Sequence, residues 1–276
     1  MTEIGANTQV CLVIGDPISH SISPEMHNAA YAATGLAGRF VYIAARVAPG
    51  ELESALRGVR ALGFRGVSVT VPHKRSVLAL VDEVEPLAEK IGAVNTIVNE
   101  NGRLKGYNTD GAGVVDPLRK RLSLKQRRIL ILGAGGAARA AAFALQAEGA
   151  LITVTNRTAA SGLALAREVG GVFQELERVQ MPEFEAVLNC TTVGMHPQVT
   201  ESPLLGSTFF PGQIVFDLVY NPYETLLLRR ARADGAEVIP GAEMFVAQGA
   251  KQFKLYTGWD PPVAEMERIL RQRLGV

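Results

Sequence analysis

The sequence has few cysteines, few aromatic residues and almost no net charge. Its two cysteines, Cys11 and Cys190, stand far apart, and no CxxC pair or His/Cys cluster at zinc spacing occurs. A disulfide scaffold and a structural metal are therefore not indicated, and we expect no metal site. Aromatic residues make up only 6% of the chain while glycine and alanine are abundant, which favours helices packed closely on sheets over a β-sandwich.

Long apolar runs and an excess of basic residues are missing as well. The formal charge is +1, whereas non-specific nucleic-acid binding relies on many basic side chains. The most apolar region, residues 129–138, is rich in glycine and too short to span a membrane. The N-terminal residues lack the basic segment, apolar stretch and cleavage site of a secretory signal. We expect a cytoplasmic protein whose partner is a small molecule, with no nucleic-acid or membrane partner.

What the chain does have is a regular alternation of short β-branched runs and helical patterns. Strands are predicted at residues 10–14, 39–44, 66–70, 94–98, 128–132, 150–155, 186–189, 213–217 and 237–239. Helices are predicted at residues 24–34, 49–62, 135–148, 158–169, 223–234 and 244–257. The alternation predicts an α/β architecture with largely parallel sheets. The length of 276 residues suffices for two domains, with a boundary expected near residues 111–113 or just before Arg128.

The second half of the chain opens with an apolar strand, a glycine turn and an alanine-rich helix. Residues 129–139 read ILILGAGGAAR, which contains the pattern G-x-G-x-x-A with Gly133, Gly135 and Ala138 at its marked places. The first glycine permits the tight turn, the second lets backbone N–H groups approach a pyrophosphate, and the third residue lets helix and strand pack. Such turns also serve plain strand-to-helix packing, but the context predicts a dinucleotide site at the helix N-terminus.

The end of the following strand distinguishes the two nicotinamide cofactors. An NAD site carries Asp or Glu about 20 residues after the glycines, where it bonds the ribose 2′-hydroxyl. Here the chain has Thr155, Asn156, Arg157 and Thr158, and no acid. The planar guanidinium of Arg157 can pair with a 2′-phosphate, and Thr158 can add a hydroxyl while it starts the next helix. NADP is favoured over NAD, and the alternative is a surface arginine beside a capping threonine.

Four polar clusters follow apolar strands in the first half. Ser21 and Ser23 stand just before a predicted helix, where Ser23 is most simply the N-cap while Ser21 has no such structural role. Lys74 follows a Pro-led turn at a predicted helix start, although a solvated surface lysine is the commoner interpretation of an isolated Lys. The other two clusters contain Asn95 and Asp110. Open α/β sheets bind ligands at strand ends, so the clusters predict a polar pocket without identifying its ligand.

Taken together, these segments resemble the shikimate dehydrogenase family over essentially the whole chain. Seven motifs in the family's order carry the likeness, and no single one would be specific. They are residues 20–28 (HSISPEMHN), 69–74 (VTVPHK), 107–111 (YNTDG), 133–139 (GAGGAAR), 156–158 (NRT), 217–222 (DLVYNP) and 241–248 (GAEMFVAQ).

The resemblance implies a substrate site and a cofactor site. The implied substrate-binding residues are Ser21, Ser23, Thr70, Asn95, Tyr220 and Gln248, with Lys74 and Asp110 as the catalytic pair. The implied cofactor is NADP (NADPH), bound by Gly133, Ala134, Gly135, Gly136, Ala137, Ala138, Asn156, Arg157, Thr158, Thr191, Val219, Gly241 and Met244.

The family's fold and reaction are implied in the same way. Residues 1–112 would form an N-terminal α/β domain that binds substrate and carries catalysis, and residues 113–244 a Rossmann-like NADP-binding domain. Residues 245–276 would form C-terminal helices that return to pack on the first domain. The implied reaction is the reversible NADPH-dependent reduction of 3-dehydroshikimate to shikimate, in aromatic amino acid biosynthesis. In it, Lys74 would polarise the carbonyl and donate a proton, while Asp110 would bond the adjacent hydroxyl and hold Lys74.

Two positions depart from the family pattern. Ser68 stands where many relatives have Asn, and we expect it to alter one contact with the substrate carboxylate or a hydroxyl. Ser161 stands where many NADP-preferring relatives carry a second basic residue, so discrimination against NAD rests on Arg157.

Other functions stay open at this point. A quinate/shikimate dehydrogenase or a shikimate dehydrogenase-like paralogue would share the fold and the catalytic pair, with looser use of substrate or of NAD. Methylenetetrahydrofolate dehydrogenases also use a lysine beside a Rossmann domain, but they do not account for Ser21 and Ser23. A non-catalytic NADP- or shikimate-binding protein would be expected to lose Lys74 or Asp110, and both are present. Both a monomer and a homodimer are compatible with the sequence.

Overall fold

The computed structural model describes residues 4–276, which divide into two compact units. The first unit runs up to Thr109 and also includes Gln248–Gly275, while the second is Asp110–Ala247. The predicted boundaries at residues 112 and 244 fall inside α4 (Asp110–Arg119) and α8 (Gly241–Thr257). Helix α8 passes from one unit into the other without a loop, which is why no linker composition marks that junction.

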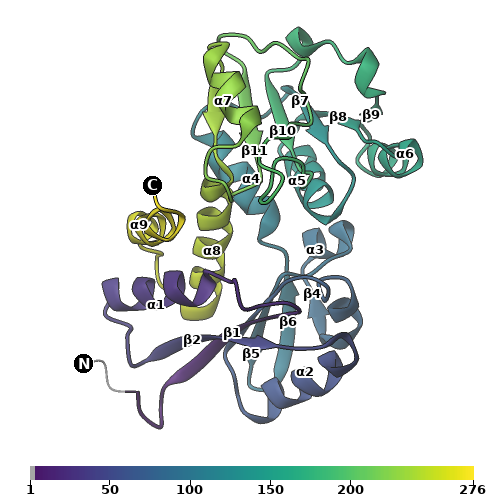
Figure 1. Cartoon of the computed structure of the whole chain (residues 1–276). Coiled ribbons are helices and arrows are strands. Elements are labelled where there is room, and N and C mark those ends of the chain that lie inside the picture. Colours follow the sequence, from purple (N-terminus) through teal and green to yellow (C-terminus); the bar gives the residue numbers. More distant parts are fainter. Residues whose placement is uncertain (1–3) are drawn as a thin grey trace. The chain divides into compact units, whose positions relative to one another are not determined.

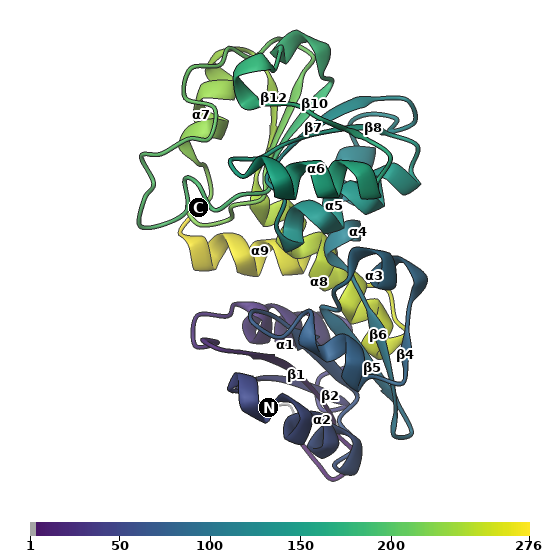
Figure 2. The ribbon, with the colours of Figure 1, turned by 90° about the vertical axis from the view of Figure 1, so that its right-hand side faces the viewer.

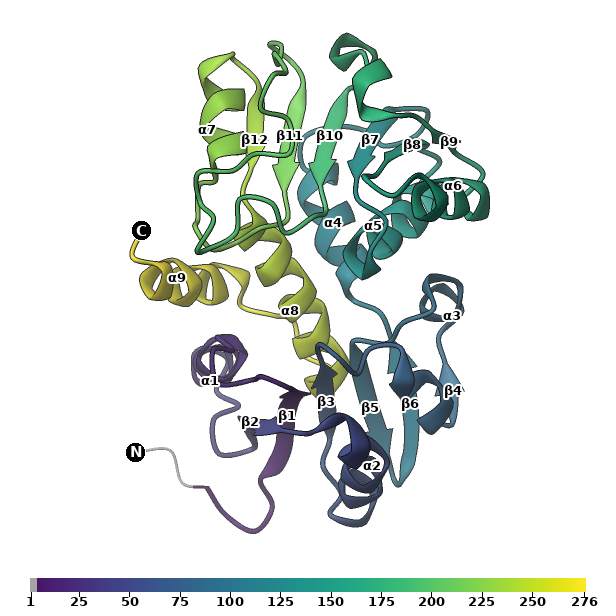
Figure 3. The same cartoon turned by 45° about the vertical axis from the view of Figure 1, so that its right-hand side comes forward.

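The second unit is built on a six-stranded sheet in which all paired strands are parallel. Figure 3 shows its strands in the order β12 (Glu237–Ile239), β11 (Ile214–Asp217), β10 (Ala186–Asn189), β7 (Arg128–Leu132), β8 (Leu151–Thr155) and β9 (Val172–Phe173). The strand order reverses between β7 and β10, which is the arrangement of a Rossmann sheet. Sheets of this kind bind dinucleotides at the carboxyl ends of the strands beside that reversal.

Helices join the parallel strands of this unit. Helix α5 (Gly136–Ala147) follows β7, α6 (Ala159–Glu168) follows β8, and α7 (Leu226–Ala233) follows β11. Both α5 and α6 contact β8, and α6 faces the viewer in Figure 2. Strand β7 is buried from Ile129 to Leu132, because parallel sheets are covered on both faces and their strands become continuous apolar runs. Short 3₁₀ turns at Leu176–Arg178 and Met181–Glu183 precede β10.

The first unit has a mixed sheet. Its strands stand in the order β2 (Phe40–Arg46), β1 (Gln9–Gly15), β3 (Gly66–Val69), β5 (Thr96–Glu100), β6 (Arg103–Tyr107) and β4 (Glu83–Val84). Strand β1 pairs in parallel with β2 and β3, but β5 runs antiparallel to both β3 and β6. The prediction of largely parallel sheets is confirmed, and β5 is the exception, since it forms a hairpin with β6. Its loop, Asn101-Gly102, has φ of 55° and 88°, and an Asn-Gly pair between strands is a strong hairpin signal.

The helices of this unit include the end of the chain. They are α1 (Ser23–Ala33), α2 (Leu52–Ala61), α3 (Pro86–Ile91) and α9 (Val263–Leu274), with 3₁₀ turns at Pro49–Glu51 and Ser76–Leu80. Helix α9 packs against α1, as Figure 1 shows, and Arg273 pairs with Glu25 at 3.5 Å. The Tyr256 ring of α8 lies so close to β3 that a Cβ at Gly66 would be 2.3 Å from Cδ1. The prediction that the C-terminal helices return to the first domain is confirmed.

Candidate active site

The glycine loop between β7 and α5 contains two kinds of glycine. Gly133 has φ of +110°, a conformation that glycine tolerates, and a Cβ there would lie 3.2 Å from Thr191 Cγ2. At Gly135 and Gly136, by contrast, a Cβ would meet no atom within 4 Å. Packing of the protein therefore does not explain these two glycines, whereas the close approach of a pyrophosphate to the backbone does.

The helix that follows this loop presents an open N-terminus. Gly135 is its N-cap without a capping side chain, and the first turn contains no acidic residue. Ala138 is buried where helix and strand pack, while Ala134 and Ala137 are half-buried beside the turn. The positive end of the helix dipole and the first backbone N–H groups suit a phosphate. These residues fit a dinucleotide.

The residues predicted for a 2′-phosphate lie after β8. Asn156 Nδ2 donates to the carbonyl of Thr158 at 2.9 Å, which closes the turn before α6. Thr158 is the N-cap of α6 but its hydroxyl makes no capping hydrogen bond, and both it and Arg157 are exposed. Arg139 differs, because its guanidinium donates to both carboxylate oxygens of Glu168, at 2.9 and 2.7 Å. Arg157 is therefore the better placed of the two arginines for a phosphate.

Two loops at the carboxyl ends of β10 and β11 are joined by a buried pair, Asn189 and Asp217. Asn189 Nδ2 donates to Asp217 Oδ1 at 2.9 Å. Asn189 Oδ1 accepts from the N–H and the hydroxyl of Thr191, at 3.0 and 2.7 Å. Asp217 Oδ1 accepts from the Val219 N–H at 3.0 Å. The pair thus holds Thr191 and Val219, two predicted cofactor residues; its sequence signal is a polar residue ending each of two apolar strands.

The Asp217 carboxyl is a buried anchor with several donors. Burial raises its pKa to about 6, against the lowering effect of hydrogen bonds from Thr225, Val219 and Asn189. Thr225 Oγ1 donates to Asp217 Oδ2 at 2.7 Å, and the same hydroxyl caps α7 by accepting from the Leu228 N–H. One carboxyl therefore fixes both loops and the start of a helix.

The start of α8 is packed tightly on the loop after β11. A Cβ at Gly241 would lie 2.5 Å from the carbonyl oxygen of Val219, so packing alone requires glycine at this predicted cofactor position. Half-buried Tyr220 stacks at a tilt on Phe245, with 5.2 Å between ring centroids. Met244 is also half-buried on this first turn of α8. In the second unit, Val219 and Tyr220 therefore both contact the beginning of α8.

In the first unit, the serine segment between β1 and α1 differs from its prediction. Ser23 is the first residue of α1 and Ile22 the N-cap, so the N-cap role predicted for Ser23 is wrong. Ser21 Oγ instead accepts from the Ser23 N–H at 3.3 Å. Ser21 therefore does have a structural contact, because its hydroxyl satisfies an N–H that opens the helix. A hydroxyl that accepts one bond still has its own hydrogen to donate.

The lysine segment follows β3. The Thr70 N–H donates to the Ile14 carbonyl at 3.0 Å, and the chain then turns into the short 3₁₀ turn Ser76–Leu80 where a helix was expected. His73 is buried with its Nε2 2.7 Å from the Val47 carbonyl. Because a carbonyl only accepts, Nε2 carries the hydrogen, and the histidine holds the segment to the residue that directly follows β2. Lys74, next to it, is half-buried.

Asn95 lies beside the lysine segment. The Val69 N–H donates to the Asn95 carbonyl at 2.7 Å, and the Val94 N–H donates to the Lys74 carbonyl at 2.8 Å. Asn95 Oδ1 accepts from the Thr109 N–H at 2.8 Å. The structure therefore brings the Thr70–Lys74 segment, Asn95 and Thr109 together in the first unit.

The remaining predicted residues open or lie within helices at the unit junctions. Asp110, which directly follows Thr109, is buried and opens α4. Gln248 is half-buried within α8, where the first unit resumes.

Ser68 has a different environment from the one expected. It is buried, and its Oγ is hydrogen-bonded to Tyr42 Oη at 2.6 Å, Gln252 Oε1 at 2.9 Å and Tyr256 Oη at 2.9 Å. Protein groups therefore occupy its hydrogen-bonding capacity, and the expectation of an altered substrate contact at Ser68 receives no support. Sequence reasoning missed Gln252 and Tyr256, whose spacing of four residues on one helix face was the available signal.

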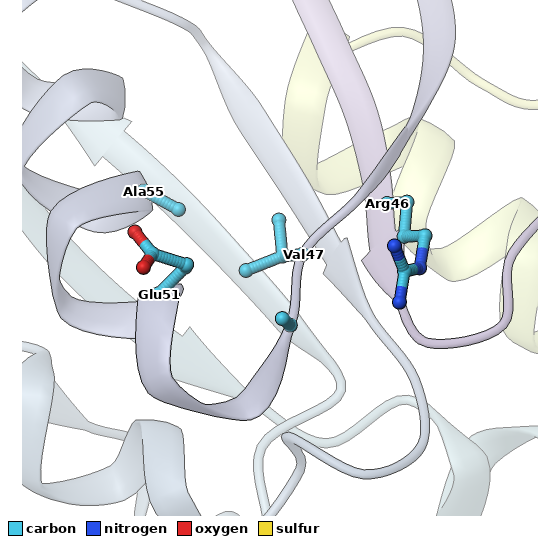
Figure 4. A pocket seen from close by; sticks show the side chains of 5 residues that line it. Arg46, Val47, Glu51 and Ala55 are labelled. Atoms are coloured by element: carbon cyan, nitrogen blue, oxygen red, sulfur yellow. The ribbon is translucent and has the colours of Figure 1, made fainter.

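A separate hollow lies at the carboxyl end of β2. Figure 4 shows Arg46 and Glu51 on either side of Val47, with Ala48 and Ala55 completing the lining. The Arg46 guanidinium donates to Asp16 at 2.8 and 3.1 Å. That ion pair already balances its charge, and none of the predicted site residues lines the hollow.

Among residues 4–276, no group of three or more His, Cys, Asp or Glu side chains is arranged to hold a metal ion. Within the same residues, no helix has the length and apolar character needed to cross a membrane.

The Rossmann strand order and the open glycine loop are the features of a dinucleotide-binding domain in the second unit. Joined to a unit with a lysine and amide cluster at its strand ends, it defines a two-domain oxidoreductase. Residues 13–97 match the shikimate dehydrogenase substrate binding domain, 117–206 the shikimate/quinate 5-dehydrogenase family and 241–271 the shikimate 5′-dehydrogenase C-terminal domain. The chain belongs to the shikimate dehydrogenase family.

Known proteins resemble the chain over its full length. The shikimate dehydrogenase (NADP(+)) of Moorella thermoacetica is 47% identical, covering 100% of this chain and 97% of the relative. A structure of Thermus thermophilus shikimate 5-dehydrogenase with NADP(H) and shikimate has a TM-score of 0.87 at 40% identity, covering 96% and 99% of the two chains. Quinate dehydrogenase from Corynebacterium glutamicum with NAD has a TM-score of 0.85 at 31% identity, covering 96% and 99%.

Proposed function

We propose that this protein is an NADP-dependent shikimate dehydrogenase, which reversibly reduces 3-dehydroshikimate to shikimate in aromatic amino acid biosynthesis. The observation that carries the proposal is the full-length likeness to an NADP-dependent shikimate dehydrogenase at 47% identity, since it extends over both units. The open glycine loop and the exposed Arg157 are the local features that support it.

The reaction turns a ring carbonyl into a hydroxyl, which takes one hydride and one proton. NADPH, when bound, supplies the hydride. We assign the proton to Lys74, whose ammonium can polarise the carbonyl and protonate the oxygen as negative charge develops. Asp110 accepts a hydrogen bond from the adjacent substrate hydroxyl and orients the lysine. Asp110 directly follows Thr109, whose N–H donates to Asn95 Oδ1. This hydrogen bond fixes the backbone just before Asp110.

The remaining predicted substrate residues offer neutral hydrogen-bonding groups. Ser21 accepts from the Ser23 N–H and keeps its own O–H to donate, which suits a substrate carboxylate. We assign the carboxylate to Ser21 and Ser23, and the ring hydroxyls to Thr70 and Asn95. Tyr220 and Gln248 are proposed as further substrate contacts on the family pattern.

The cofactor proposal rests on residues of the second unit. The backbone at Gly135 and Gly136 can approach a pyrophosphate, since nothing in the protein fills the space a Cβ would take. The Arg157 guanidinium can meet a 2′-phosphate with two parallel hydrogen bonds. No acidic residue stands at positions 155–158, where an NAD site would bond the ribose.

A quinate dehydrogenase is the second candidate, favoured by the likeness to the Corynebacterium glutamicum enzyme. Steady-state kinetics on the purified protein should compare shikimate with quinate, each with NADP⁺ and with NAD⁺. We expect the highest kcat/KM with shikimate and NADP⁺. A preference for quinate with NAD⁺ would overturn the proposal, and complete absence of turnover would favour a non-catalytic binding protein.

We further propose that the enzyme works in the cytoplasm, as a monomer or a homodimer. Size-exclusion chromatography with light scattering distinguishes the two assemblies.

A further inference from the structure

A continuous chain of buried hydrogen bonds crosses the first unit and ends at the proposed substrate residue Asn95. Its members come from β2, β3, β5 and α8, and all are buried. They are Tyr42, Ser68, Thr96, Gln252 and Tyr256.

Ser68 is the first branching point of this series of hydrogen bonds. Tyr42 Oη donates to its Oγ at 2.6 Å, and this Oγ donates in turn to Gln252 Oε1 at 2.9 Å. A serine hydroxyl has one hydrogen and two acceptor positions, so the 2.9 Å contact with Tyr256 makes the tyrosine the donor. The Ser68 hydroxyl then makes all three of its hydrogen bonds. Its own bond to Gln252 Oε1 directs the amide oxygen of Gln252 toward β3.

The orientation of that amide determines what Thr96 does. With Oε1 held by Ser68, Gln252 Nε2 donates to Thr96 Oγ1 at 3.0 Å. The Thr96 hydroxyl is thereby an acceptor from α8, and its own hydrogen goes to Asn95 Oδ1 at 2.7 Å. If the Gln252 amide were reversed, Thr96 would donate to Gln252 and lose its bond to Asn95.

This series of hydrogen bonds ends at the Asn95 side chain, whose amide has a defined orientation. Its Oδ1 also accepts from the Thr109 N–H at 2.8 Å, and a backbone N–H can only donate. This contact identifies the atom as the amide oxygen. Nδ2 donates to Thr109 Oγ1 at 3.0 Å, and the same Oγ1 lies 3.3 Å from Oδ1. Two donors, one from β5 and one from the residue before Asp110, hold the same amide oxygen.

We propose that Gln252 is a positioning residue for substrate binding, which acts through Thr96 to orient the Asn95 amide. The inference rests on the proposed function, because it takes Asn95 as a substrate contact. An apolar side chain of similar size would fill the space in α8 equally well, so packing does not require an amide at position 252. Burial of an amide is unfavourable unless its hydrogen bonds are made, and here the Nε2 bond leads through Thr96 to Asn95.

The test measures kcat, KM and the calorimetric shikimate dissociation constant for wild type and five variants. Gln252→Met keeps the length and removes the amide, Thr96→Val keeps the shape and removes the hydroxyl, and Thr96→Ser restores the hydroxyl. The double variant Gln252→Met/Thr96→Val tests whether the two residues act in one chain. Gln213→Met is the matched control, since Gln213 is also a buried glutamine, with Nε2 bonded to the carbonyls of Met181 and Phe184.

We expect Gln252→Met and Thr96→Val each to raise the KM and dissociation constant for shikimate about tenfold, the effect of one positioned hydrogen bond. Changes in kcat and in the KM for NADP⁺ should stay within about twofold. Thr96→Ser should restore wild-type values, and the double variant should be no worse than the singles. Gln213→Met should lower the melting temperature while shikimate binding stays unchanged.

Other outcomes separate the explanations. A lowered melting temperature with unchanged shikimate binding in Gln252→Met, or additive effects in the double variant, overturns the positioning role. If Gln252→Met does not fold, the Thr96→Val and Thr96→Ser pair decides. A wild-type protein that binds shikimate without turning it over refutes the proposed activity alone, while absence of binding refutes both.

Discussion

His73 and Lys74 are sequence neighbours that the fold uses differently. His73 is buried and its Nε2 donates to the Val47 carbonyl at 2.7 Å, so it holds the segment to the chain just after β2. The carbonyl oxygen of Lys74 accepts a hydrogen bond from the Val94 N–H at 2.8 Å, which fixes the backbone at the lysine. Because the backbone is fixed on both sides of Lys74, the lysine loses less conformational entropy when it binds a substrate.

Replacing Lys74 by alanine should remove proton transfer. General acid–base groups typically contribute ~10²–10⁴-fold, so we expect kcat to fall in that range while shikimate affinity changes far less. Steady-state kinetics with calorimetric binding measures both quantities. Lys90→Ala, on the exposed side of α3, is the control and should match wild type. A Lys74→Ala enzyme within a factor of two of wild-type kcat would contradict the assignment.

Arg157 should determine the choice of cofactor. Hydrogen bonds to charged groups contribute about 1.5–3 kcal/mol, so Arg157→Ala should raise the KM for NADP⁺ about 10–100-fold and leave that for NAD⁺ unchanged. Ser161→Arg, on the first turn of α6, should increase the preference for NADP⁺. Arg167→Ala, exposed further along α6, is the control. Equal losses with both cofactors would show that Arg157 does not contact a 2′-phosphate.

At the scale of secondary structure, the packing of α8 requires glycine at two positions. One is the first residue of the helix, and the other is on β3. Gly241 opens α8 against the Val219 carbonyl, and Gly66 on β3 accepts the ring of Tyr256. Neither glycine is required by its φ. Each is required because another segment occupies the space where a side chain would be.

Gly66→Ala should therefore destabilise the first unit. The added Cβ would lie 2.3 Å from Tyr256 Cδ1, and overpacking of this kind typically costs about 1–3 kcal/mol. Urea unfolding measures the change in the free energy of unfolding. Gly58→Ala in α2 adds a methyl group that meets nothing within 4 Å, and it should be neutral or stabilising by about 0.5–1 kcal/mol. Equal effects of the two substitutions would contradict the packing argument.

At the scale of the whole chain, the two units carry different parts of the proposed site. Most of the proposed substrate residues lie in the first unit, and the proposed cofactor residues lie in the second. Each ligand stabilises the part of the chain that binds it. In hydrogen exchange, shikimate should therefore protect residues 4–109 and 248–275 most strongly, and NADP⁺ residues 110–247. The reverse distribution would contradict the assignment of sites to units.

His27 should make the chain sensitive to acid. Burial lowers its pKa from 6.5 to about 3, against a smaller raising effect of Gln252. The unfolded chain therefore binds a proton below pH 6.5 that the folded chain binds only near pH 3. The free energy of unfolding should fall by up to about 1.4 kcal/mol per pH unit as the pH drops through this window.

The His27→Phe variant isolates this contribution. Phenylalanine can keep the stacking on Tyr42, whose ring centroid lies 4.3 Å away, but it cannot titrate. Urea unfolding between pH 4 and 7 should show wild type losing stability relative to the variant as the pH falls. Asp217 has the opposite shift but is present in both proteins, so its effect cancels in the difference. A pH-independent difference between the two proteins would exclude His27 as the cause.

Local patterns in the sequence determined the alternation of elements, the glycine loop and the absence of an acid beside Arg157. These depend on residues close in the chain, where spacing alone sets which groups meet. Only the tertiary structure decided the antiparallel pairing of β5 with β3 and the pair Asn189–Asp217. It also showed that Ser68 bonds to Gln252. Each of these joins separate segments through packing and hydrogen bonds, and such long-range partners leave no fixed spacing in the sequence.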